Sequence, residues 1–154
     1  MKWITHEIVT GAVVHALTGD PLAALWSMAG AVFPDKAEGS PQKRGWANWR
    51  SSHRGWSHWP LLYIALIGLL LKSEMYFPLA ADKLDDLSRI GIFLCLGALL
   101  HIFEDALCGK VPHLTPQKKA GLRLFKVGSF REYICGIIIV IAVYLMRMLY
   151  DCLK

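Results

Sequence analysis

The chain has 154 residues, of which 55% are hydrophobic and 19% charged, and its net charge is +5. Its length fits a single domain over residues 1–154, and its apolar content excludes a mainly disordered chain. The four cysteines are scattered without a CxxC pair, which excludes a disulfide scaffold and a cysteine-rich zinc module. A basic surface suits anionic partners, namely phosphates, acidic lipid headgroups or nucleic acid.

The hydrophobic pattern predicts five helices and no strands. The helices are expected at residues 5–18, 22–33, 55–71, 84–108 and 133–150. Three connections separate them: a polar loop at 35–52, a segment at 73–86 that contains Pro78, and a basic loop at 109–130. The expected fold class is all-α, a small bundle of about five helices.

Local signals set the ends of the first two helices. Thr5 is expected to cap the start of the first helix. Gly19 is expected to end it, and Pro21 to begin the second helix, which Pro34 closes. The two helices therefore form a hairpin.

The apolar runs are long enough to raise the question of membrane insertion. A span needs about 20 apolar residues, and the third, fourth and fifth helices approach that length. The first helix, at about 21 Å, is too short, so the hairpin is expected to dip into the bilayer or to pack on the bundle. A soluble bundle with unusually apolar helices is the alternative, and composition favours an integral membrane protein.

Up-and-down packing of these helices gathers polar side chains at one end of the bundle. His6 and Asp35 lie at the free end of the hairpin, and residues 53–58, His-Arg-Gly-Trp-Ser-His, lie at the start of the third helix. His101 and Asp105 are four residues apart, so they share one helix face. Burial of so many imidazoles and carboxylates without a cation is costly, which predicts a metal site. The expected ligands are His6, Asp35, His53, His58, His101 and Asp105.

Imidazole and carboxylate ligands favour Zn²⁺, with Mn²⁺ and Fe²⁺ as alternatives. His15 and His113 lie outside this group and are interpreted as ordinary structural histidines. Arg54 is a candidate clamp for a phosphate, or equally an ion-pair partner that orients Asp35 or Asp105.

The order of these segments resembles the YdjM-like family of bacterial inner-membrane, metal-dependent hydrolases. The resemblance runs from Thr5-His6 through residues 33–35, 53–58 and 101–105 to the basic tail with Gly128 and Glu132. It implies a metal-dependent hydrolase in the inner membrane and covers nearly the whole chain. The ligand types and their order also resemble, more loosely, zinc-dependent phospholipase C and the P1-type nucleases, which cleave phosphate esters.

The chain departs from the family pattern at one motif. Where the family has Pro-Asp-x-Asp-His, this chain has Ala37 and Glu38 in place of the last two residues. Alanine cannot bind a metal, so a reduced site is expected. Glu38 is expected to take a proton from water at the metal, and Glu104 is a weaker candidate because it points about 100° away from Asp105.

Charge and tryptophan content indicate where the site lies. The loops at 36–54 and 109–130 are both basic, which by the positive-inside rule places this end of the bundle in the cytoplasm. Four tryptophans between residues 46 and 59 suit the membrane–water interface, next to lipid phosphates, and make nucleic acid a less favoured partner.

Three functions therefore stand as hypotheses. The first is a membrane-bound hydrolase that acts on a phosphate ester or lipid headgroup. The second is a non-catalytic metal-binding membrane protein, and the third is a soluble helical nuclease.

Overall fold

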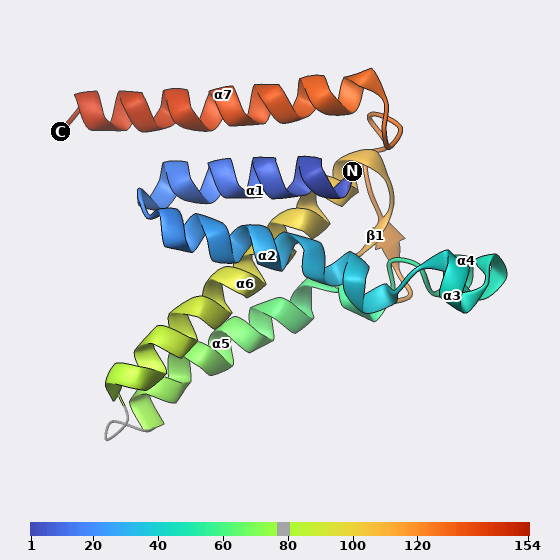
Figure 1. Cartoon of the computed structure of the whole chain (residues 1–154), viewed down its shortest axis with the longest axis horizontal. Helices are drawn as coiled ribbons and strands as arrows, with labels where there is room; N and C mark the ends of the chain where they lie inside the picture. Colours follow the sequence, from blue (N-terminus) through green and yellow to red (C-terminus); the bar gives the residue numbers. More distant parts are fainter. Residues whose placement is uncertain (77–80) are drawn as a thin grey trace.

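The computed structural model describes residues 1–76 and 81–154, and these are mainly helical (Figure 1). The elements in chain order are α1 (Trp3–Thr18), α2 (Pro21–Glu38), α3 (Pro41–Arg44), α4 (Trp46–Ser52), the 3-10 turn η1 (Trp56–His58), α5 (Pro60–Tyr76), α6 (Ala81–Cys108), β1 (Val111–Pro112), β2 (Lys119–Ala120) and α7 (Phe130–Cys152). The all-α class is confirmed. The predicted connection at 73–86 is wrong in its described part, because α5 continues to Tyr76 and α6 begins at Ala81, while residues 77–80 lie outside the described residues.

The expectation of no strands is wrong within the basic loop at 109–130. There β1 and β2 pair antiparallel, with Val111 opposite Ala120. The amide of Lys118 donates to the carbonyl of Thr115 at 3.1 Å, and this turn brings the two segments together. Strands of two residues are too short for an alternating pattern to appear in the sequence.

The hairpin of α1 and α2 is confirmed. Gly19 has a φ of 71°, in the left-handed region that glycine adopts readily, and ends α1. The side chain of Asp20 then accepts a hydrogen bond from the amide of Leu22 at 2.8 Å and caps α2. The predicted cap at Thr5 is wrong, because α1 already begins at Trp3 and the hydroxyl of Thr5 instead donates to Glu132.

The predicted end of the second helix at Pro34 is also wrong. Pro34 is fully buried inside α2, which continues to Glu38. A proline removes one backbone hydrogen bond, and here tertiary packing holds the last turn in spite of that loss. As a result, Asp35 and Glu38 stand three residues apart on one helical turn.

The segment between α2 and α5 is more ordered than expected. The predicted polar loop contains α3 and α4, and the third long helix begins at Pro60 rather than near Gly55. Residues 53–58 therefore form a turn with a single 3-10 element ahead of α5. This turn carries His53 and His58 to the end of α2.

All five long helices have one terminus at the same end of the bundle, as the up-and-down prediction requires. Figure 1 shows the start of α1, the end of α2, the start of α5, the end of α6 and the start of α7 meeting beside β1. The opposite ends of α5 and α6 lie far from this point. The shared end is where the predicted ligands gather.

Two helices are long and apolar enough to cross a membrane, Asp86–Cys108 and Phe130–Cys152. The second has a mean hydropathy of 2.1, and only 6% of it is buried, unlike the core helix of a soluble protein. In α5, the apolar stretch found among the described side chains is Pro60–Lys72, which is shorter than a typical span. By length and composition, the fourth and fifth predicted helices are therefore each able to cross a membrane.

Two glycines let α2 and α6 approach closely. A Cβ added at Gly97 would lie 1.9 Å from the carbonyl oxygen of Ser27, and one at Gly30 would lie 2.0 Å from that of Leu94. Small residues at such crossings allow backbone contact between apolar helices. This contact fixes Asp35 on α2 relative to His101 on α6.

Replacing Gly97 with alanine is expected to lower the stability of the bundle by about 1–3 kcal/mol, because the helices must separate. Thermal unfolding in detergent measures this. Gly68→Ala is the matched control, since a Cβ there meets nothing within 4 Å. Equal stability of the two variants would contradict the close contact.

Candidate metal centre

Four side chains meet at the shared end of the bundle. Asp35, His58, His101 and Asp105 each offer one ligand atom, and these atoms all lie within 4.8 Å of one another. They come from the last turn of α2, from η1 and from the last two turns of α6. Both histidines and Asp105 are buried. Four of the six predicted ligands therefore form one cluster.

The spacing within this cluster is regular. The Nε2 atoms of His58 and His101 lie 3.2 Å apart. Oδ1 of Asp35 lies 3.4 Å from His58 Nε2 and 3.7 Å from His101 Nε2. Oδ2 of Asp105 lies 3.6 Å and 3.7 Å from the same two nitrogens.

These separations fit a tetrahedral metal site. Zinc bonds of about 2.0–2.2 Å to nitrogen and oxygen put the ligand atoms of a tetrahedron about 3.3–3.6 Å apart. The observed distances of 3.2–3.7 Å bracket that range. The donor set of two imidazoles and two carboxylates also suits a divalent transition metal. The residues present therefore fit a metal ion.

Glu38 contacts the imidazole of His58 at Nδ1, while Nε2 of the same ring faces the cluster. Its Oε1 lies 2.9 Å from His58 Nδ1 and accepts a hydrogen bond from the hydroxyl of Ser57 at 2.8 Å. A carboxylate on Nδ1 keeps the proton on that nitrogen and leaves the Nε2 lone pair free for a metal. Glu38 thus connects the residue 53–58 turn to the end of α2.

His53 is not in the cluster. Its Nδ1 lies 2.6 Å from Oε2 of Glu38, and its ring stacks on Trp49 with centroids 4.1 Å apart. Both Asp35 and His53 were predicted as ligands, and the cluster contains Asp35 but not His53. A role for His53 as a ligand stays a prediction.

His6 lies against the cluster but outside it. Its Nδ1 is 2.6 Å from Oε2 of Glu104, and its ring is 3.9 Å from that of His101. Its Nε2 is fully buried without a hydrogen-bond partner among the described residues and lies 3.4 Å from Oδ1 of Asp105. Glu104 is thus a buried partner of His6 rather than a solvated charge.

Arg54 forms an ion pair with Asp105, with Nη2 2.8 Å from Oδ2. The backbone of Arg54 has a φ of 55°, a conformation that costs energy outside glycine and is often found at functional sites. Gly109 leaves room for the guanidinium, because a Cβ there would lie 2.0 Å from Arg54 Nη1. Of the two roles considered for Arg54, the structure shows the ion pair, with Asp105 rather than Asp35.

Sequence reasoning missed two contacts at the site. The indole of Trp3 donates to Oδ2 of Asp35 at 2.7 Å, and the α-amino group of Met1 lies 2.6 Å from Oδ1 of Asp105. Neither residue belongs to a spacing pattern. In the sequence, the only indication that the Trp3 side chain faces the site is its position one turn before His6 on the same helix.

Charge balance at the site favours a cation. Burial by itself would raise the pKa of Glu38, but hydrogen bonds from His53 and His58 outweigh it and hold that pKa well below its usual range. The pKa of Asp35 is likewise lowered in spite of burial, through its contact with His58. Burial would lower the pKa of His58, yet these two carboxylates raise it. The carboxylates are therefore ionised, as metal binding requires.

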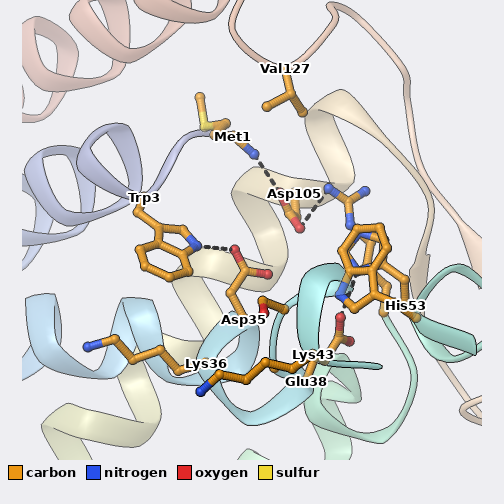
Figure 2. Close-up of a pocket in the computed structure, with 13 residues that line it drawn as sticks. Met1, Trp3, Asp35, Lys36, Glu38, Lys43, His53, Asp105 and Val127 are labelled. Atoms are coloured by element: carbon orange, nitrogen blue, oxygen red, sulfur yellow. Dashed lines mark hydrogen bonds and ion pairs between the residues drawn. The ribbon is translucent and has the colours of Figure 1, made fainter. Parts of the chain in front are cut away.

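A pocket of about 510 Å³ opens beside the cluster (Figure 2). Asp35 and Asp105 line it together with Glu38, His53 and Arg54. Figure 2 shows Trp3 on one side and His53 on the other, with Asp35 and Asp105 between them. The pocket has the size of a small-molecule site and brings a ligand next to the metal-binding atoms.

Comparison with known proteins gives one match. No curated protein and no solved structure matches the chain, so the looser resemblance to phospholipase C and P1-type nucleases gains no support. The model of the YdjM inner membrane protein family matches residues 1–152. The two helices that are long and apolar enough to cross a membrane agree with this description. The chain belongs to the YdjM inner membrane protein family.

Proposed function

We propose that the protein is a membrane-bound, metal-dependent hydrolase that acts on a phosphate ester at the membrane surface. The observation that carries this proposal is the four-donor cluster of Asp35, His58, His101 and Asp105 at the wall of an open pocket. When bound, a divalent ion lowers the pKa of a water molecule and polarises a phosphoryl oxygen. Zn²⁺ is the favoured ion because of the tetrahedral spacing, with Mn²⁺ or Fe²⁺ as alternatives.

Glu38 and His53 form the proton-accepting pair in this proposal. His53 is partly exposed and lines the pocket, and its Nδ1 is held 2.6 Å from Glu38. An imidazole in this position takes the proton from the attacking water, and Glu38 stabilises the imidazolium that forms. Glu38 thus stabilises the positive charge that His53 gains with the proton, and it also orients His58.

Arg54 is the candidate for phosphate binding. Its guanidinium lines the pocket and is already held 2.8 Å from Asp105. A guanidinium fixed by one carboxylate presents its remaining N–H groups in a defined direction, which suits a phosphoryl oxygen. The ion pair and the phosphate contact are therefore compatible roles of one side chain.

A second candidate function is non-catalytic metal binding, and one observation favours it. The cluster offers four protein donors, the number typical of structural zinc sites, whereas catalytic zinc sites usually have three protein ligands and an open position. A soluble nuclease is disfavoured by membership of an inner membrane family. Metal analysis of detergent-purified protein, followed by assays on phosphomonoesters and phosphodiesters, separates the two. Bound metal without turnover on any ester would favour the non-catalytic role.

We also propose that the site faces the cytoplasm. The basic residues of the loops at 36–54 and 109–130 are Lys36, Lys43, Arg44, Arg50, Arg54, Lys110, Lys118, Lys119, Arg123 and Lys126. Such loops stay on the cytoplasmic side of a bacterial membrane. Because α7 is long enough to cross, its far end with Cys152 then lies on the periplasmic side.

Labelling with a membrane-impermeant maleimide tests this orientation. In intact cells, the exposed Cys152 of the wild type is expected to react. A cysteine introduced at Leu114, which is 67% exposed, in a Cys152→Ser background is expected to react only after permeabilisation. Labelling of the Leu114→Cys variant in intact cells would overturn the orientation, as would recovery of the protein without detergent.

A further inference from the structure

We propose that the ligand of this site is an anionic phospholipid, whose phosphate binds Lys36 and Lys43 and whose acyl chain lies in a groove between α2, α5 and α6. This inference rests on the proposed function and narrows its substrate class. It joins two cavities that are separate in the structure, the metal-site pocket and an apolar groove beside it.

The apolar groove has a volume of about 400 Å³. Its lining comes from three helices and consists of Ala29, Phe33, Tyr63, Leu66, Leu69, Leu70, Gly91, Leu94 and Cys95. The only hydroxyl in this lining, that of Tyr63, is turned to the carbonyl oxygen of Ser57, to which it donates at 2.7 Å. Such a surface suits a hydrocarbon chain, and it lies beside a helix that is long and apolar enough to cross the membrane.

Residues that line the groove and a residue that lines the metal-site pocket share one face of α2. Ala29, Phe33 and Lys36 follow one another at spacings of four and three residues, so their side chains lie on one helix face. The first two line the groove, and Lys36 lines the pocket. At the same end, Tyr63 contacts the turn that holds Ser57, whose hydroxyl binds Glu38. Under this proposal, a molecule in the groove places its polar end beside the metal-site pocket.

The polar end of this path is positively charged. Lys36 and Lys43 both line the pocket, and in Figure 2 both side chains extend toward the Trp3 side, away from His53. Neither ammonium group has a carboxylate within ion-pair distance among the described residues. Two unpaired cations at the head of an apolar groove complement an anionic phosphate that carries a hydrocarbon chain.

The proposal is tested by binding of dioleoyl phosphatidylglycerol to the detergent-purified protein. Native mass spectrometry counts the bound lipid molecules, and a fluorescence titration gives the affinity. We expect the Lys36→Gln/Lys43→Gln variant to bind this lipid at least about tenfold more weakly, as expected for lost charge-assisted hydrogen bonds. Lys110→Gln, in the basic loop but outside the pocket lining, is the control.

A second variant tests the groove. Ala29→Trp fills it from an exposed position on α2, and we expect it to weaken binding of the long-chain lipid by about tenfold while leaving binding of glycerol 3-phosphate unchanged. Ile141→Trp, on the exposed face of α7, is the matched control and is expected to change neither. Equal affinity for the lipid and for glycerol 3-phosphate, with no effect of Ala29→Trp, would overturn the inference.

These readouts separate the inference from the proposed function. Lipid binding with the expected variant effects supports the inference even where no ester is hydrolysed. The absence of hydrolysis then counts against the proposed catalysis and not against lipid binding. Hydrolysis of soluble phosphate esters without selective lipid binding supports the proposed function and overturns the inference.

Discussion

Replacing His101 with alanine is expected to remove the metal from the purified protein. His101 Nε2 lies 3.2–3.7 Å from the other three donor atoms of the cluster, and the ring is fully buried, so no outside ligand replaces it without rearrangement. Loss of a side chain that hydrogen-bonds to a metal ligand lowers metal affinity by about 10–100-fold. Loss of the ligand itself is expected to lower the affinity further. Metal content measured by plasma emission spectroscopy, together with a competition titration against a chelator, gives the affinity.

The controls for this experiment are other histidines of the same chain. His113→Ala is expected to keep the wild-type metal content, because His113 is exposed and its ring is hydrogen-bonded to the carbonyl of Lys118, in the turn between β1 and β2. Full metal content in His101→Ala would refute the cluster as the metal site. His6→Ala shows whether the orphaned Nε2 of His6 contributes a further donor.

The gathering of the site residues at one end of the bundle was predictable, because local sequence features at the turn between the first two helices determine it. Gly19, Asp20 and Pro21 specify a reversal of the chain through a left-handed residue, a side-chain cap and a fixed φ. Once that hairpin forms, the order of the remaining helices places the polar segments together. The spacing of His101 and Asp105 likewise gave a shared face from helix geometry alone.

The end of α2 was not predictable, because it depends on tertiary contacts. A proline in a helical pattern predicts a break, and only the burial of Pro34 against the rest of the bundle shows why the helix continues. This one turn decides the site. It points Asp35 at the two buried imidazoles and places Glu38 between His53 and His58.

The different roles of His53 and His58 were also not predictable from the sequence. His53 and His58 flank one turn with the same residue type, and their spacing makes both equally good ligands. The backbone of that turn sends His58 inward to full burial and leaves His53 at the pocket wall, 30% exposed. Glu104 follows the same principle, since its buried position depends on the approach of α1, which brings His6 to it.

Replacing His53 with glutamine is expected to lower turnover about 10²–10⁴-fold while metal content stays at the wild-type value. The reason is position: His53 lies outside the donor cluster, lines the pocket, and is held at its Nδ1 by Glu38. Single-turnover hydrolysis of a soluble phosphodiester by metal-loaded protein measures the effect. Loss of metal from His53→Gln would instead make His53 a ligand and contradict its assignment as the proton acceptor.

Glu38→Gln is expected to combine two losses, and this pattern distinguishes it from His53→Gln. The carboxylate stabilises the His53 imidazolium, so turnover should fall over the same range of about 10²–10⁴-fold. It also fixes the Nδ1 proton of His58 at 2.9 Å, so metal affinity should fall by a further factor of about 10–100. The double variant is expected to be no slower than Glu38→Gln alone, because the two side chains act on one proton. Independent, additive losses would show that Glu38 and His53 do not work as a pair.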